Sequence, residues 1–131
     1  VSSIAPVIAS GNTCVVLASE SLPLSSVTFS EVLNSSDVPG GVINILTGNH
    51  AEMTKPMASH MDVNAIVYSG GDAELIMSLR ETSVLNLKRI RSYSNDWMKA
   101  DSQGMHFITD CTEIKTTWHP IENIGGATSS Y

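Results

Sequence analysis

Positive charge is scarce in this chain of 131 residues, where seven Lys and Arg stand against thirteen Asp and Glu and give a formal net charge of −6. Nucleic acids and anionic lipid surfaces require a basic footprint, so the sequence predicts no nucleic-acid partner and no membrane partner. Long hydrophobic runs are missing too, because no stretch approaches the roughly 20 apolar residues that span a bilayer. The N-terminus also lacks a signal-peptide pattern. We therefore expect a cytoplasmic protein that binds small ligands or other proteins.

Cysteine is equally rare. Cys14 and Cys111 lie far apart, and Cys14 stands inside an apolar run in which a thiol behaves as a small hydrophobic group, so two buried, reduced thiols are predicted. The histidines lack the spacing of a metal site, and we expect no metal. They are His50, His60, His106 and His119. The chain does not begin with methionine and opens on an apolar, helix-like stretch, which leads us to expect that it is part of something longer.

Apolar residues make up 42% of the chain, enough to bury a core. Short runs rich in β-branched residues occur at 13–17, 42–46 and 65–68, and they are apolar on both faces, as parallel strands covered by helices are. Helical patterns lie between and after them. The alternation predicts an α/β fold with a doubly wound parallel sheet.

The helix boundaries are marked by prolines and one acid. Pro23 opens a helix that extends to about Leu33, and Pro56 should keep a second helix, around 51–59, short or kinked. Asp72 is a predicted N-cap for a third helix, whose apolar face carries Leu75, Ile76 and Leu79.

Beyond Leu87 the patterns weaken. We expect a fourth strand at 90–93 and a short strand at 105–109. In the segment 113–118 polar and apolar residues alternate, which is typical of an edge or inter-subunit strand, and 121–131 is small and polar, as in a flexible tail. The face of the alternating segment is formed by Ile114, Thr116 and Trp118.

The sequences of several segments resemble motifs of the aldehyde dehydrogenase superfamily. A-S-G-N-T-C-V-V-L-A-S-E-S-L-P-L-S, at 9–25, is similar to that family's A-A-G-N-T-V-V-L-K-P-S-E-x-T-P-L-S. Three further blocks, at 38–48, 59–66 and 67–74, resemble L-P-P-G-V-L-N-V-V-T-G, S-H-P-D-V-D-A-I and A-F-T-G-S-T-E-V. The resemblance covers roughly residues 3 to 90 and implies a Rossmann-like domain over 1–110 that is part of a nucleotide-binding domain.

Further along, the sequence departs from this family. Where the family has L-K-R-V-T-L-E-L-G-G-K, with the glutamate that activates water, this chain places Tyr93, and a phenol with a pKa near 10 is no general base at neutral pH. The segment 111–118 then resembles the C-terminal oligomerisation strand Y-T-E-V-K-T-V-W, so we divide off 111–120 as an oligomerisation-type strand. Between Tyr93 and this segment, the chain lacks the domain that carries the family's nucleophilic cysteine. This arrangement most resembles the truncated, degenerate second module of family 16 aldehyde dehydrogenases.

The resemblance also implies where a cofactor would bind. Glu20 matches the family's ribose-binding glutamate, and Gly70 and Gly71 match the turn before the helix that faces the pyrophosphate. Against binding, Leu17 replaces the family's lysine, and Asp72 adds negative charge at the helix start, where it repels a phosphate. We therefore interpret Glu20, Gly70 and Gly71 as vestigial and expect no cofactor in this fragment.

These observations favour a catalytically incompetent module with a structural, assembly or protein-interaction role in a larger dehydrogenase-like protein. Neither cysteine lies at the family's nucleophile position, so no catalytic residue is predicted. The alternative is that the fragment belongs to an active NAD-dependent aldehyde dehydrogenase whose catalytic residues lie elsewhere in the polypeptide. The expected partners are the remainder of a longer chain and a second copy that docks through 113–118. Trp118 is expected at that interface, whereas Trp97 is interpreted as a core residue.

Overall fold

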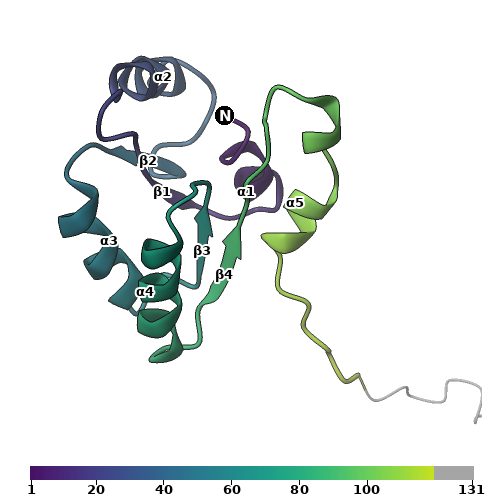
Figure 1. Cartoon of the computed structure of the whole chain (residues 1–131). Helices are drawn as coiled ribbons and strands as arrows, with labels where there is room; N and C mark the ends of the chain where they lie inside the picture. The colour runs from purple at the N-terminus through teal and green to yellow at the C-terminus, as the bar shows by residue number, and fades with distance from the viewer. Residues whose placement is uncertain (120–131) are drawn as a thin grey trace, which may run out of the picture.

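The computed structural model describes residues 1–119, and the expected tail at 121–131 lies outside the described residues. Helices and strands alternate along the chain, as the sequence predicts (Figure 1). The elements are α1 (Ala5–Ala9), β1 (Cys14–Leu17), α2 (Leu24–Asn34), β2 (Ile43–Leu46), α3 (His50–Ser59), β3 (Ala65–Tyr68), α4 (Ala73–Val84), β4 (Arg89–Ser92), the 3-10 helix η1 (Ala100–Ser102) and α5 (His106–Asp110).

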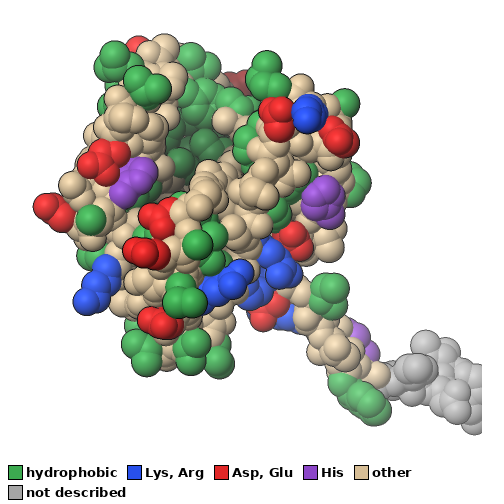
Figure 2. Space-filling model, in the orientation of Figure 1, with side chains coloured by type: hydrophobic (Ala, Val, Ile, Leu, Met, Phe, Trp, Pro, Cys, Tyr) green, Lys and Arg blue, Asp and Glu red, His purple; other side chains and the backbone are tan. Residues whose placement is uncertain are grey.

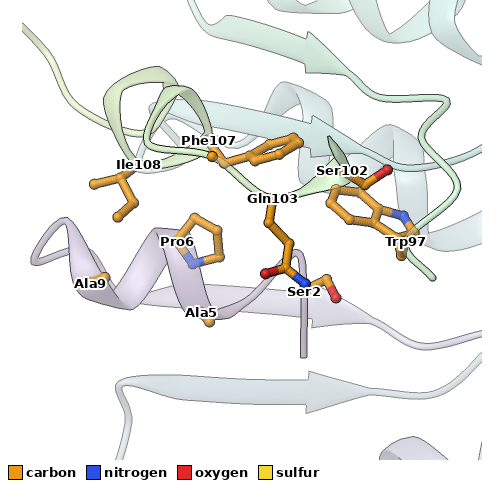
Figure 3. Close-up of a pocket in the computed structure, with 10 residues that line it drawn as sticks. Ser2, Ala5, Pro6, Ala9, Trp97, Ser102, Gln103, Phe107 and Ile108 are labelled. Atoms are coloured by element: carbon orange, nitrogen blue, oxygen red, sulfur yellow. The ribbon is translucent and has the colours of Figure 1, made fainter. Parts of the chain in front are cut away.

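The strands form two parallel pairs. β1 pairs with β2 in the register Cys14↔Ile43, and β3 pairs with β4 in the register Ala65↔Arg89. Figures 1 and 3 both show the strands in the spatial order β2, β1, β3, β4. Within the part of the chain that the structure describes, no ladder joins β1 to β3. The parallel α/β architecture is confirmed. The single sheet that we expected is divided, with the break between β1 and β3.

Local capping explains where the longer helices begin. The Asp72 side chain accepts hydrogen bonds from two amides of the first turn of α4, which confirms the predicted N-cap. Asn49 does the same for α3 by accepting from Glu52 N at 3.2 Å. Helix α3 continues through Pro56 and has ten residues. In Figure 1, α3 packs beside α4 and α1 packs beside α5, with the strands between these two helix pairs.

One expectation for the C-terminal third is wrong, and another stays a prediction. Residues 105–109 were expected as a strand, but Met105 is the N-cap of α5 and 106–109 lie within this helix, where Thr109 N bonds back to Met105 O at 3.0 Å and Phe107 is buried. The segment 113–118 has no strand assignment. A strand requires a ladder partner, and no described residue pairs with this segment. The expected fourth strand is present as β4.

The core is small for a chain of this length. Among residues 1–119 the buried apolar residues are Ile4, Ala18, Ala58, Leu79, Phe107 and Cys111. Large apolar side chains are exposed on the folded elements, and they include Val15, Leu24 and Val32. Figure 2 shows hydrophobic side chains on the surface of this face. The fold therefore leaves apolar surface that an isolated domain would cover.

Candidate functional site

Glu20 lies just beyond the carboxyl end of β1, and its carboxylate is directed at the start of α3. Its Oε2 accepts a hydrogen bond from His50 N at 3.0 Å, and its Oε1 accepts one from Asn49 Nδ2 at 3.3 Å. The ring of His50 returns to the same loop, with Nε2 2.7 Å from Ala18 O. A carboxylate at a helix N-terminus satisfies free amides and interacts favourably with the helix dipole. Glu20 therefore has a structural use that requires no ligand.

The glycine turn lies at the carboxyl end of β3, and a tyrosine covers it. Tyr68 is the last residue of β3, and its Oη accepts a hydrogen bond from Asp72 N at 3.3 Å. A Cβ atom at Gly70 would collide with that phenol, whereas one at Gly71 would meet nothing within 4 Å. The missing side chain of Gly70 thus makes room for Tyr68. Tyr68 was not among the residues predicted from the sequence, although an aromatic residue two positions before a glycine pair is a signal that indicates such a contact.

The first turn of α4 satisfies its own amides. Asp72 Oδ1 accepts from Glu74 N at 3.0 Å and from Leu75 N at 3.1 Å. Helix N-termini bind phosphate through free amides and a positive dipole end. Here Tyr68 and Asp72 already occupy three of those amides, and the Asp72 and Glu74 carboxylates add negative charge. This helix start is a poor site for a pyrophosphate.

Tyr93 stands where the family's general base is expected, but it acts as a hydrogen-bond donor. Its hydroxyl donates to Asp110 Oδ2 at 2.9 Å, and Asp110 Oδ1 lies 3.2 Å from Arg91 Nε. Burial raises the pKa of Tyr93 far above its usual value, and the hydrogen bond to Asp110 raises it further. The ring packs edge-on against Trp97 and Phe107, with centroids 6.2 and 4.8 Å away. The half-buried Trp97 thus belongs to an aromatic cluster with Tyr93 and Phe107.

Both cysteines are free thiols on structural elements. Burial raises the pKa of the Cys14 thiol in β1. Burial also raises the pKa of the Cys111 thiol. The Asp110 carboxylate raises this pKa further, and the Arg89 guanidinium lowers it. A nucleophilic cysteine requires a lowered pKa, so neither thiol is activated. Among residues 1–119, no group of three or more His, Cys, Asp or Glu side chains could hold a metal ion.

The predicted interface residues are exposed. Ile114 and Trp118 show 89% and 91% of their surfaces, and Thr116 is exposed as well. Arg89 Nη1 donates to Thr112 O and fixes the start of this segment. Whether these side chains become buried against another module or subunit stays a prediction.

A cavity of about 250 Å³ lies between α1 and the region from Trp97 to α5 (Figure 3). Pro6, Phe107 and Ile108 give it an apolar wall, and Gln103 is directed toward it. None of its lining residues is titratable, so it offers no acid, base or nucleophile.

Comparison with known proteins identifies the lineage. Residues 1–91 match the model of the aldehyde dehydrogenase family. The chain belongs to this family. It is 26% identical over 111 residues to the NADP/NAD-dependent aldehyde dehydrogenase PuuC of Escherichia coli, a match that covers 84% of this chain and 21% of that protein. It is 41% identical over 68 residues to the hydroxyisobutyraldehyde dehydrogenase of Mycolicibacterium austroafricanum, a match that covers 52% of this chain and 14% of that protein.

Solved aldehyde dehydrogenases share the fold. The Bartonella henselae enzyme aligns with a TM-score of 0.64 and 28% identity over 68% of this chain and 18% of its own. The Staphylococcus aureus betaine aldehyde dehydrogenase, crystallised with NAD⁺, aligns with a TM-score of 0.65 and 27% identity over 70% of this chain and 18% of its own. The chain therefore spans about a fifth of the length of such relatives. The aldehyde dehydrogenase superfamily and the partial Rossmann-like fold, both predicted from the sequence, are confirmed.

In the part of the chain that the structure describes, no helix is long and apolar enough to cross a membrane.

Proposed function

We propose that this chain is a catalytically incompetent aldehyde-dehydrogenase-like module with a structural role in the assembly of a larger dehydrogenase-like protein. One observation carries the proposal: the groups that would receive NAD are occupied by the chain itself. Glu20 caps α3, while Tyr68 and Asp72 satisfy the amides that open α4. The hydroxyl of Tyr93, in the place of the general base, donates a hydrogen bond to Asp110.

The same features support a finer assignment to the truncated second module of family 16 aldehyde dehydrogenases. That assignment rests on the loss of the general base and on the early arrival of the 111–118 segment. The partners in this proposal are the remainder of the longer polypeptide and a second copy that docks through Ile114, Thr116 and Trp118. The proposed compartment is the cytoplasm.

Calorimetric titration with NAD and NADP tests the cofactor part. Loss of one charge-assisted hydrogen bond, as when Leu17 replaces the family's lysine, weakens binding by roughly ten- to a hundredfold, and the acidic start of α4 weakens it further. We expect no heat of binding at micromolar concentrations, with the Staphylococcus aureus betaine aldehyde dehydrogenase as positive control. A micromolar dissociation constant would contradict the proposal.

A pair of variants separates capping from cofactor binding at Glu20. If Glu20 serves as a cap, Glu20→Gln lowers the melting temperature and leaves the calorimetric trace flat. Glu31→Gln, on the exposed surface of α2, is the matched control and should change neither measurement. Binding of NAD that Glu20→Gln abolishes, with no change in stability, would mean that Glu20 is still a ribose ligand.

A second candidate is that the parent polypeptide is an active NAD-dependent aldehyde dehydrogenase whose cysteine and glutamate lie outside this chain. The similarity of this chain to proteins named as aldehyde dehydrogenases favours this candidate. Intact mass measurement of the native protein, followed by an assay of NAD reduction with a panel of aldehydes, distinguishes the two. Turnover by the native protein but not by residues 1–131 supports the second candidate. Cysteine-dependent turnover by residues 1–131 alone would refute the first.

A further inference from the structure

The cavity between α1 and the region from Trp97 to α5 has walls from segments that are far apart in the sequence. Pro6 of α1 lies on one wall, and Phe107 and Ile108 of α5 lie on the other. In Figure 3 the Pro6 ring points toward α5, and Trp97 lies at one end of the space. The family model matches residues 1–91, so the second wall lies outside the matched residues. We call this space the α1–α5 cavity.

The lining of the α1–α5 cavity is uncharged. Trp97, Phe107, Ile108 and Pro6 are apolar, and none of the residues that line the cavity carries a formal charge. An ion that entered this space would lose its hydration without gaining a partner of opposite charge, which is strongly unfavourable. The chemistry of the lining therefore selects an uncharged ligand.

Two rings on the lining favour an aromatic ligand. The centroids of Trp97 and Phe107 lie 5.2 Å apart, and the ring planes are tilted by 46°. Aromatic rings attract one another at such separations in offset or edge-to-face arrangements. Trp97 is half-buried and lines the cavity, so a third ring can contact it from the cavity side.

Gln103 gives the cavity a polar group that a ligand can reach. Its side chain is directed toward the cavity in Figure 3, and the residue is exposed. An amide has both a carbonyl acceptor and N–H donors, so it can bond to either kind of polar group. The hydroxyl of Ser102, which also lines the cavity, already donates to Asp96 O at 2.6 Å. Gln103 is therefore the better anchor for a ligand.

The volume of the cavity limits the size of the ligand. The cavity measures about 250 Å³, whereas an engineered apolar cavity of about 150 Å³ binds benzene. Pockets for drug-sized ligands begin at roughly 300 Å³. A bicyclic molecule such as indole lies between these limits.

We propose that the α1–α5 cavity binds a small, uncharged aromatic molecule that carries one hydrogen-bonding group, with its ring against Trp97 and Phe107 and its polar group on Gln103. The cavity offers no acid, base or nucleophile, so the molecule is bound without being transformed. Because the ligand contacts both α1 and α5, its binding stabilises the packing of these two helices. The site goes beyond the proposed function, since it requires neither NAD nor the larger polypeptide.

Proton–nitrogen correlation NMR of the whole chain, titrated with indole, tests the proposal. The chain has two tryptophans, so the indole N–H signal of the exposed Trp118 is an internal control for that of Trp97. We expect the signals of Trp97 and of the Gln103 side-chain amide to shift, with a dissociation constant of roughly 0.1 to 1 mM for a ligand of this size. The Trp118 signal should stay in place.

Two further probes have the same number of non-hydrogen atoms as indole and separate the contributions to binding. Indene keeps the bicyclic shape but lacks the N–H group, so it should bind roughly two- to tenfold more weakly. Benzoate is aromatic but charged, and it should cause no shift of the Trp97 signal.

Variants of the lining provide a second test. Gln103→Leu removes the amide, so indole and indene should bind this variant equally, an effect that a general loss of stability would not produce. Ala9→Phe fills part of the cavity from α1 and should weaken binding of both probes by roughly tenfold or more. Ala51→Phe, at an exposed position of α3, is the matched control. Circular dichroism checks that the variants fold, and Gln103→Leu carries the test if Ala9→Phe does not.

Any of four outcomes would overturn the proposal. An unshifted Trp97 signal at saturating indole would mean that the cavity binds no such ligand. Equal affinities of indole and indene for the unmodified chain would exclude Gln103 as the anchor, and binding of benzoate would contradict the uncharged class. Nuclear Overhauser contacts from another protein segment onto Phe107 in the free chain would identify a protein side chain as the occupant. None of these measurements involves NAD or turnover, so this proposal and the proposed function fail separately.

Discussion

Lys88 is a buried cation, and replacing it should unfold the chain at a markedly lower temperature. The residue is only 9% exposed, and its Nζ donates to Val63 O at 2.6 Å and to the carbonyl of His60, the C-cap of α3. Lys88→Met keeps the length of the side chain and its apolar stem but removes both hydrogen bonds. Asn86 Nδ2, 3.3 Å from His60 O, still partly satisfies that carbonyl, whereas Val63 O loses its only side-chain donor in the described structure.

The expected loss follows from these contacts. A hydrogen bond to a charged group contributes about 1.5 to 3 kcal/mol, and a buried carbonyl left unsatisfied costs about 1 to 3 kcal/mol. Lys88→Met leaves Val63 O without a side-chain donor and His60 O with a weaker one. We therefore expect it to destabilise the fold by about 2 to 3 kcal/mol. This corresponds to a decrease of roughly 10 °C in melting temperature for a domain of this size.

The assay is thermal unfolding followed by circular dichroism, with Lys99→Met as the control. Lys99 lies 3.8 Å from Asp96 on the surface, with 67% of its side chain exposed. Such a pair contributes about 0.5 kcal/mol or less. Equal melting temperatures for the two variants would refute the argument that Lys88 holds the end of α3.

Three further predictions concern the aromatic cluster, the interface segment and the thiols. Because the pKa of Tyr93 is raised in the fold, the folded chain keeps a proton that the unfolded chain releases above about pH 10. The contribution of Tyr93 to stability is therefore complete below that pH and is lost above it, so in urea titrations the stability advantage over Tyr93→Phe should shrink as the pH rises beyond 10. An advantage that grows above pH 10 would contradict the raised pKa. Trp118→Ala should weaken self-association, measured by light scattering, by roughly 30-fold if Trp118 contributes about 2 kcal/mol to the interface. The melting temperature should stay unchanged, because Trp118 is 91% exposed. An unchanged mass together with a lower melting temperature would mean that Trp118 is a core residue. Burial raises the pKa of both Cys14 and Cys111, so iodoacetamide should label them slowly at pH 7 and rapidly in urea; fast labelling of the native chain would show an activated thiol.

What the sequence could predict was local. The strands at 14–17, 43–46 and 65–68 follow from runs of β-branched residues, and Asp72 caps α4 through amides two and three positions away. Both signals lie within one turn or one strand. The family was also within reach, because its motifs lie in order along the first two thirds of the chain.

What it could not predict depends on distant partners. Five residues at 105–109 suit a short strand as well as a helix, and the burial of Phe107 against Tyr93 and Trp97 accompanies the helix. The capping role of Glu20 requires the amide of His50, thirty positions away. Sequence patterns around either residue carry no record of such a contact.

The hydrogen bond from Asn12 Nδ2 to Cys111 O, 2.8 Å long and 99 positions apart in sequence, has a consequence for biosynthesis. Each strand pair is joined through a single helix and can form while the rest of the chain is still being translated, but α1 and the start of β1 must wait for α5 to leave the ribosome. Closing a loop of that length costs about 4 kcal/mol in chain entropy. Helix α5 thus completes the packing of α1, so this part of the fold forms only after both helices have been synthesised.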